Sequence, residues 1–301
     1  MPILTALAIL VRIIANPLAN VFQKQLTHRT ADPLFITTAT YGFLTLTCLA
    51  FWPYIQVSGL SGGFWGSMLA CAGLAVVGNV FLVRAMHLGD LSVLGPINAW
   101  KSVVSMAVAV VLLGEIPGWA GLAGVVLMVV GSYVVLNTKP TATTPETDLS
   151  IFRNRLSVLA RPDVRLRLIA LVCSGIDGVF LKKAILLSTP LTAFFGWCGL
   201  GFALSGVWVA VSLRGQWRAQ TQLLAQQWPL VLGVFASVRL MQVATNYAFS
   251  GTQVSYALVL FQTSALLSVL FGYRFFGETD IRHKLIGAAI MVAGAVLIIG
   301  R

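Results

Sequence analysis

Residues 114–131 of the chain read GEIPGWAGLAGVVLMVVG, and residues 277–294 read GETDIRHKLIGAAIMVAG. Both stretches begin with a Gly-Glu pair and continue into an apolar run that carries two glycines seven residues apart. A shift of 163 residues aligns Leu122, Gly124, Met128, Val129 and Gly131 with Leu285, Gly287, Met291, Val292 and Gly294. The same shift pairs Ala85 with Ala248 and Ser92 with Ser255. One register that holds over three consecutive apolar segments indicates an internal repeat.

Apolar character extends over the whole chain. Apolar residues fill 58% of the 301 positions and charged residues only 10%, and the mean hydropathy is +0.89. A membrane-spanning helix needs about 20 consecutive apolar residues. Such runs recur ten times, at 3–24, 33–54, 63–86, 91–113, 118–137, 165–187, 190–213, 228–249, 252–273 and 283–300. The sequence therefore predicts an all-α integral membrane protein with ten transmembrane helices, the first of them a true span rather than a signal peptide.

The ten runs divide into two halves around one long polar interval. Residues 138–164 are rich in Thr and Pro and then basic, which predicts a linker between a first repeat at 1–137 and a second at 165–301. Because five is an odd number of helices, the second repeat must enter the membrane upside down. Inverted repeats are common in alternating-access transporters, whose substrate site lies near the bilayer midplane between the repeats.

Four charged residues lie near the centres of predicted spans: Arg12, Lys101, Asp177 and Arg239. A charge at the bilayer centre costs at least about 2.5–3.5 kcal/mol on insertion scales. Mutual neutralisation inside the bundle is one interpretation, but three cations face a single acid. The surplus positive charge favours a central polar cavity that binds an anionic or zwitterionic ligand.

Amide side chains extend these charges into polar stripes along the helices. Residues three or four positions apart share a helix face, as Arg12, Asn16 and Asn20 do in the first run. Aromatic side chains would form walls of the cavity, with packing or interfacial anchoring as the alternative role. The predicted substrate-binding residues are Arg12, Asn16, Asn20, Asn79, Asn98, Trp100, Lys101, Asp177, Arg239, Gln242, Asn246, Tyr247, Tyr256 and Gln262.

Several function classes lack support in the sequence. There is no Walker-type phosphate loop and no H-E-x-x-H motif, so we expect no enzyme activity, no cofactor and no metal site. The four cysteines show no metal or redox spacing. The net charge of +11 comes from basic residues at the ends of apolar runs, where membrane topology places them, so we expect no nucleic-acid partner.

The arrangement resembles the ten-helix, EamA-like branch of the drug/metabolite transporter superfamily. The resemblance covers nearly the whole chain. It depends on the passage from LSVLGPINAW through LLGE to GLAGVVLMVVG, on its echo in FFGETD and LIGAAIMVAG, and on Lys24 and Lys182 near the ends of each half's first helix. The family implies export or exchange of small metabolites such as amino acids or sugars, with both termini in the cytoplasm.

The loop charges predict the opposite orientation from the family. One side of the membrane would hold Lys182, Lys183 and Arg301. The other would hold Lys24, Arg29, Arg84, Lys139, Arg153, Arg155, Arg161, Arg165, Arg167, Arg214, Arg218, Arg274, Arg282 and Lys284. Because basic residues stay on the cytoplasmic side, we expect the linker inside and both termini outside the cell membrane.

The leading functional hypothesis is a multi-pass secondary transporter of small metabolites such as amino acids or organic anions, driven by proton coupling or exchange. Its expected partners are a small-molecule substrate and the lipid bilayer, and it would act as a monomer or homodimer. The alternatives are a transporter of cationic compounds that uses Asp177, a membrane-embedded enzyme, and a non-transporting membrane subunit.

Overall fold

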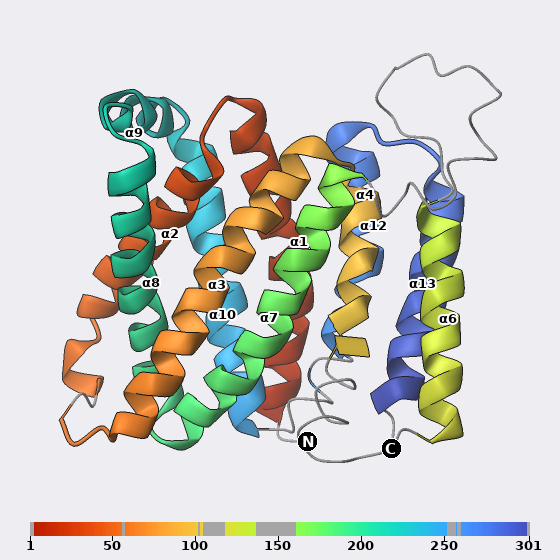
Figure 1. Cartoon of the computed structure of the whole chain (residues 1–301), viewed down its shortest axis with the longest axis horizontal. Coiled ribbons are helices and arrows are strands. Elements are labelled where there is room, and N and C mark those ends of the chain that lie inside the picture. Colours follow the sequence, from red (N-terminus) through yellow and green to blue (C-terminus); the bar gives the residue numbers. More distant parts are fainter. Residues whose placement is uncertain are drawn as a thin grey trace.

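The computed structural model describes residues 3–55, 58–101, 103–104, 118–136, 161–251, 257 and 260–299. The described part is helical throughout (Figure 1). Its elements are α1 (Ile3–His28), α2 (Pro33–Leu49), η1 (Trp52–Tyr54), α3 (Gly62–Leu88), α4 (Leu91–Ile97), η2 (Asn98–Trp100), α6 (Trp119–Leu136), α7 (Pro162–Leu186), α8 (Pro190–Ser212), α9 (Trp217–Gln226), α10 (Trp228–Gly251), α12 (Ser264–Phe276) and α13 (Ile281–Ile299).

Local sequence signals start several of these helices. Asp32 precedes α2 and its carboxylate accepts hydrogen bonds from the backbone N–H groups of Leu34 and Phe35, at 2.8 and 3.2 Å. Thr189 caps α8 in the same way through the N–H of Thr192 at 3.1 Å. Such side chains satisfy donors that a helix leaves unpaired at its first turn.

The apolar helices are long enough to cross a bilayer. Among the described residues, α1, α3, α8 and α10 meet both the length and the hydropathy of a spanning helix, and α2, α6 and α12 are shorter apolar helices. On α1 the side chains of Leu7, Leu10 and Ile14 are exposed on the outer face of the bundle, opposite the polar stripe. Exposed aliphatic side chains on a helix this apolar are in place to contact lipid.

Helix contacts follow the internal repeat. Helix α3 packs along α7, and α1 packs along α10, so exchanging the two halves converts one pair into the other. The remaining close pairs join each helix to its own counterpart: α2 with α8, α4 with α12, and α6 with α13. In Figure 1, α1 rises from the lower end of the bundle whereas α7 descends from the upper end. This arrangement is consistent with a ten-span fold of two inverted repeats.

The repeated glycines lie where α6 and α13 meet. A Cβ atom added to Gly131 would lie 2.7 Å from the carbonyl oxygen of Gly287, and one added to Gly287 would lie 2.8 Å from the carbonyl oxygen of Gly131. A Cβ at Gly294 would likewise lie 2.7 Å from the carbonyl oxygen of Gly124. These glycines therefore bring two helices of one chain into backbone contact, as small residues do in membranes.

Candidate functional site

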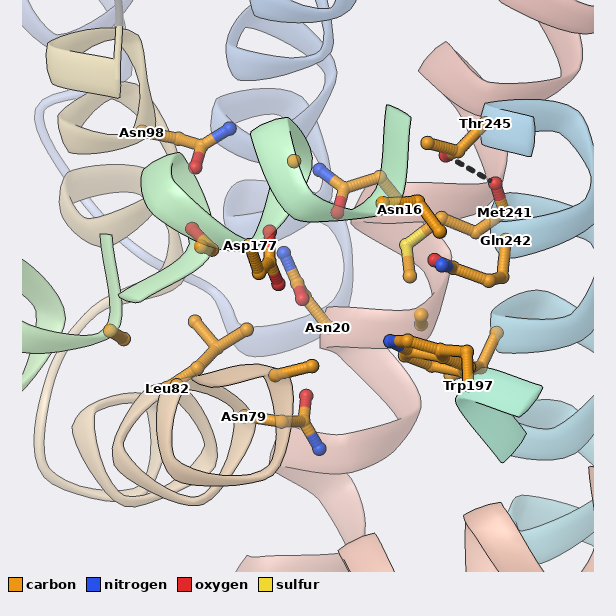
Figure 2. Close-up of a pocket in the computed structure, with 18 of the residues that line it drawn as sticks. Asn16, Asn20, Asn79, Leu82, Asn98, Asp177, Trp197, Met241, Gln242 and Thr245 are labelled. Carbon is orange, nitrogen blue, oxygen red and sulfur yellow. Dashed lines mark hydrogen bonds between the residues drawn. The ribbon is translucent and has the colours of Figure 1, made fainter. Parts of the chain in front are cut away.

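A polar cavity lies in the middle of the bundle, and both halves line it (Figure 2). Its wall comprises parts of α1, α2, α3, α7, α8 and α10, together with Asn98 of η2, Lys101 and Phe261. None of the predicted site residues lies on the second or seventh span, yet these spans contribute Thr37, Thr40 and Tyr41 from α2 and Trp197 from α8.

Eight of the predicted site residues line this cavity: Arg12, Asn16, Asn20, Asn79, Asn98, Lys101, Asp177 and Gln242. Figure 2 shows the amides of Asn16, Asn20 and Asn98 around the same space as the carboxylate of Asp177. The four-residue spacing of the α1 stripe explains why Arg12, Asn16 and Asn20 point the same way. Gln23, which continues this stripe, also lines the cavity.

Arg12 is held by α10 and by an aromatic ring. Its Nε atom donates to Oγ1 of Thr245 at 2.9 Å, and its guanidinium carbon lies 4.9 Å from the centre of the Phe261 ring. Its Nη1 atom is buried and has no hydrogen-bond partner within the described part of the chain. A charged donor without a partner in a cavity wall is available to a ligand or to water.

Asp177 is the acid of the cavity. It is half-buried, and its carboxylate lies within the electrostatic reach of Lys101 and Arg12. Among the described residues none of the ion pairs within 4.0 Å includes Asp177. The acid is therefore near cations without being locked to one of them.

Arg167 is a cavity residue, although the positive-inside count places it among the basic residues at the cytoplasmic end of the predicted span 165–187. Its side chain is 5% exposed, and its Nε atom donates to the backbone carbonyl of Leu94 at 3.0 Å. That carbonyl is available because α4 tightens into η2, where the N–H of Asn98 bonds to Gly95 and Pro96 instead. On α7 the lining residues Arg167, Ala170, Ser174 and Asp177 are three or four positions apart, so Arg167 belongs to the same helix face as Asp177.

Three predicted residues lie away from the cavity, contrary to expectation. Arg239 places its guanidinium 5.7 Å from the centre of the Phe51 ring, beyond the end of α2. Trp100 turns toward α6, where its Nε1 atom donates to Oγ of Ser132 at 2.6 Å. Tyr247 is 46% exposed on the outer surface of the bundle. The reason is rotational: each lies on a helix that lines the cavity, but not on the lining face.

Two further predicted residues lie just behind the cavity wall. Asn246 is buried and donates to the carbonyl of Gln242 at 3.1 Å, while its own Oδ1 atom has no partner among the described residues. Gln262 is buried beside the lining residue Asn98, whose Nδ2 atom lies 3.5 Å from its Oε1. Tyr256 falls outside the described residues.

The described residues contain no group of three or more His, Cys, Asp or Glu side chains placed to hold a metal ion. All four cysteines are unbonded. Among the described residues, the cavity wall offers three cations, one carboxylate, and neutral donors and acceptors from α1, α2, α3, η2, α7, α8 and α10.

Comparisons with known proteins agree with this architecture. A solved structure titled "Crystal structure of protein" has a TM-score of 0.60 at 14% identity, covering 97% of this chain and 96% of its own. This likeness shows a shared fold. No curated protein matches the chain. The profile of the EamA-like transporter family, a group of non-enzymatic membrane transporters, matches residues 3–137 and 164–300. The chain, a multi-pass membrane protein of two such repeats, belongs to the EamA-like transporter family.

Proposed function

We propose that this protein is a secondary active transporter of small metabolites that carry an anionic group, such as amino acids or organic anions. The observation that carries the proposal is the charge of the cavity wall. Among the described residues, Arg12, Lys101 and Arg167 line it together with one acid, Asp177. A cationic cargo would meet net repulsion in a medium that screens charges poorly, whereas a carboxylate or phosphate would be attracted.

A zwitterionic cargo fits the same wall. Its anionic group would lie near the cations, and its amine would face Asp177, whose carboxylate is not fixed in an ion pair within the described residues. The amides of Asn16, Asn20 and Asn98 would bind the uncharged parts of the cargo as donors or acceptors. Exchange of the exposed side between the two inverted repeats would move the cargo across the membrane.

A second candidate function follows from the same acid. If Asp177 faces the cavity without a bound cation, it would attract a cationic compound, and the basic residues would serve other partners. The lack of an ion pair within 4.0 Å that includes Asp177 among the described residues favours this candidate. The two candidates predict opposite outcomes on neutralising Lys101, because a cationic cargo would then bind more tightly.

The orientation and organisation of the chain are part of the proposal. The loop charges support a cytoplasmic linker at 138–164 between repeats at 1–137 and 165–301, with both termini outside the cell. Export or exchange driven by a proton gradient or a counter-substrate fits a chain without a nucleotide-binding loop. The α6 and α13 glycines contact each other inside one chain, so a homodimer would have to use another face.

The test is uptake into proteoliposomes that contain the purified full-length chain. The probes are radiolabelled amino acids, dicarboxylates and the lipophilic cation tetraphenylphosphonium, each with and without a proton gradient. The Lys101→Gln variant should lower uptake of anionic or zwitterionic probes by about tenfold or more, since a hydrogen bond to a charged group contributes roughly 1.5–3 kcal/mol.

The matched control is Arg239→Gln, which removes a cation from a cavity-lining helix at a position outside the cavity. It should leave uptake unchanged. If the cation is the only probe taken up, and if Lys101→Gln raises its uptake, the anionic assignment is overturned and the second candidate is established.

A further inference from the structure

A second cluster of charges lies at the upper end of the bundle in Figure 1, where α1 ends and α4 and α13 begin. Its residues do not line the cavity, and their side chains are largely buried. Lys24 and Glu278 are 4% and 2% exposed, and Nζ of Lys24 lies 3.1 Å from Oε1 of Glu278. Beside them Lys284, 0% exposed, lies 3.4 Å from Oδ2 of Asp90. We call these four residues the end cluster.

Glu278 holds the first turn of α4 from the opposite half of the chain. Its two carboxylate oxygens accept hydrogen bonds from the backbone N–H groups of Leu91 and Ser92, both at 2.7 Å. Asp90 precedes α4 but forms no side-chain cap, so the capping carboxylate comes from the α12–α13 turn. Gly277 has a φ of +63° there, a conformation that glycine adopts without strain.

Lys24 completes the connection. Its ammonium group donates to the carbonyl of Gly89 at 2.8 Å as well as to Glu278, and it lies 4.6 Å from the centre of the Phe276 ring. The ion pairs Lys24–Glu278 and Lys284–Asp90 both join the first half of the chain to the second. The end cluster therefore holds the two halves of the chain together at this end of the bundle.

The end cluster is also adjacent to the cavity along the chain. Gln23, which precedes Lys24, lines the cavity, and α4 leads directly into the lining residues Asn98 and Lys101. A movement of α4 away from Glu278 would therefore move part of the cavity wall. The same movement would separate the halves at this end.

We propose that the end cluster is a latch that closes one end of the transport path and breaks when the cavity opens there. Ion pairs suit this task because two charges that separate into water regain hydration, which largely offsets the lost attraction. An apolar plug would lose its burial on opening without compensation. A charged latch therefore keeps the closed and open states close in free energy, as alternating access requires.

The latch rests on the alternating-access function proposed above, and its test needs no cargo. The four cysteines are replaced by alanine, and Ser174, a cavity-lining residue of α7, is changed to Cys in the full-length chain. Labelling of that Cys by a membrane-impermeant maleimide is then measured from each side of the membrane. Compared with this parent, Glu278→Gln should raise labelling from the end-cluster side by at least about tenfold, because the equilibrium shifts toward the open state.

The matched control is Arg161→Gln. Arg161 forms an ion pair with Asp163 at 2.7 Å at the same end of the bundle, but Arg161 is the N-cap of α7 and Asp163 lies in its first turn, so both residues belong to the second half. Labelling in this control should equal that of the parent. Equal labelling from the end-cluster side in Glu278→Gln and the control would overturn the latch.

If Glu278→Gln does not fold to a monodisperse protein, a second variant provides the test. Lys24→Gln removes the ion pair but leaves both Glu278 caps on α4, and it should raise the same labelling by several-fold. Unchanged labelling in this variant would overturn the latch. A protein that switches accessibility without moving any probe in proteoliposomes would reject the transport proposal and retain the latch.

Discussion

The contact between α6 and α13 provides the sharpest test of how the two halves are joined. A methyl group added at Gly131 would lie 2.5 Å from Cγ of Met291 and 2.7 Å from the carbonyl oxygen of Gly287. The methionine side chain can rotate away, but the carbonyl belongs to the α13 backbone. The Gly131→Ala variant must therefore push the two helices apart.

The loss of unfolding free energy follows from how far the two helices must separate. Bringing 2.7 Å to an ordinary contact needs a separation of about 0.5–1 Å, which forfeits roughly a quarter to a half of the dispersion energy at each affected contact. Overpacked cores lose about 1–3 kcal/mol. We expect Gly131→Ala to lower the free energy of unfolding by about 1–3 kcal/mol. The double variant with Gly287→Ala should lose less than the sum of the single variants, because the second methyl enters a gap already opened.

The assay is unfolding of the purified protein in mixed micelles by increasing sodium dodecyl sulfate, followed by tryptophan fluorescence. Gly199→Ala on α8 is the control, since no atom lies within 4 Å of its added Cβ. Its free energy of unfolding should stay the same or rise by up to about 1 kcal/mol. Equal stability of Gly131→Ala and this control would refute the backbone contact between α6 and α13.

Three further predictions concern packing, topology and cargo. Ser132→Ala removes the acceptor of the Trp100 indole N–H and should cost about 1–3 kcal/mol of unfolding free energy in the same titration, whereas Ser250→Ala, whose hydroxyl is exposed, should cost nothing measurable. A reporter fused after Arg301 should be active as an extracytoplasmic marker, and a fusion active only in the cytoplasm would show that family orientation prevails over loop charge. Asp177→Asn should weaken uptake of amine-bearing cargo by about tenfold or more while retaining purely anionic cargo, or else abolish its proton dependence; unchanged uptake and coupling would exclude a role for this carboxylate.

The sequence predicts the helices well where hydropathy alone decides them. The predicted spans 190–213 and 283–300 correspond to α8 at Pro190–Ser212 and α13 at Ile281–Ile299. It gave no sign of α9, because WRAQTQLLAQ is too polar and too short to register as a span. Nor does it predict the change from α-helix to 3-10 helix at Asn98–Trp100, since η2 depends on how α4 packs rather than on the number of apolar residues.

Helical periodicity predicts which residues share a face but not which way that face points. On α10 the cavity-facing residues are Val238, Met241, Gln242, Thr245 and Phe249. Arg239 and Asn246 each follow a lining residue by one position, which turns them about 100° away from the cavity. Polar character made them look like the lining face, whereas the face that lines the cavity on this helix is largely apolar.

The exchange of Arg239 for Arg167 shows what an insertion-cost argument can decide. A charge inside a span must meet polar surroundings, an aromatic ring or an opposite charge, and Arg239 finds the ring of Phe51. Arg167 finds the carbonyl that the α4–η2 junction leaves free, which no count of apolar residues could reveal. The cost of burial thus limits how many charges the bundle can hold, while backbone irregularities decide where they lie. The surplus of cations in the cavity survives this exchange, and so does the preference for anionic cargo that rests on it.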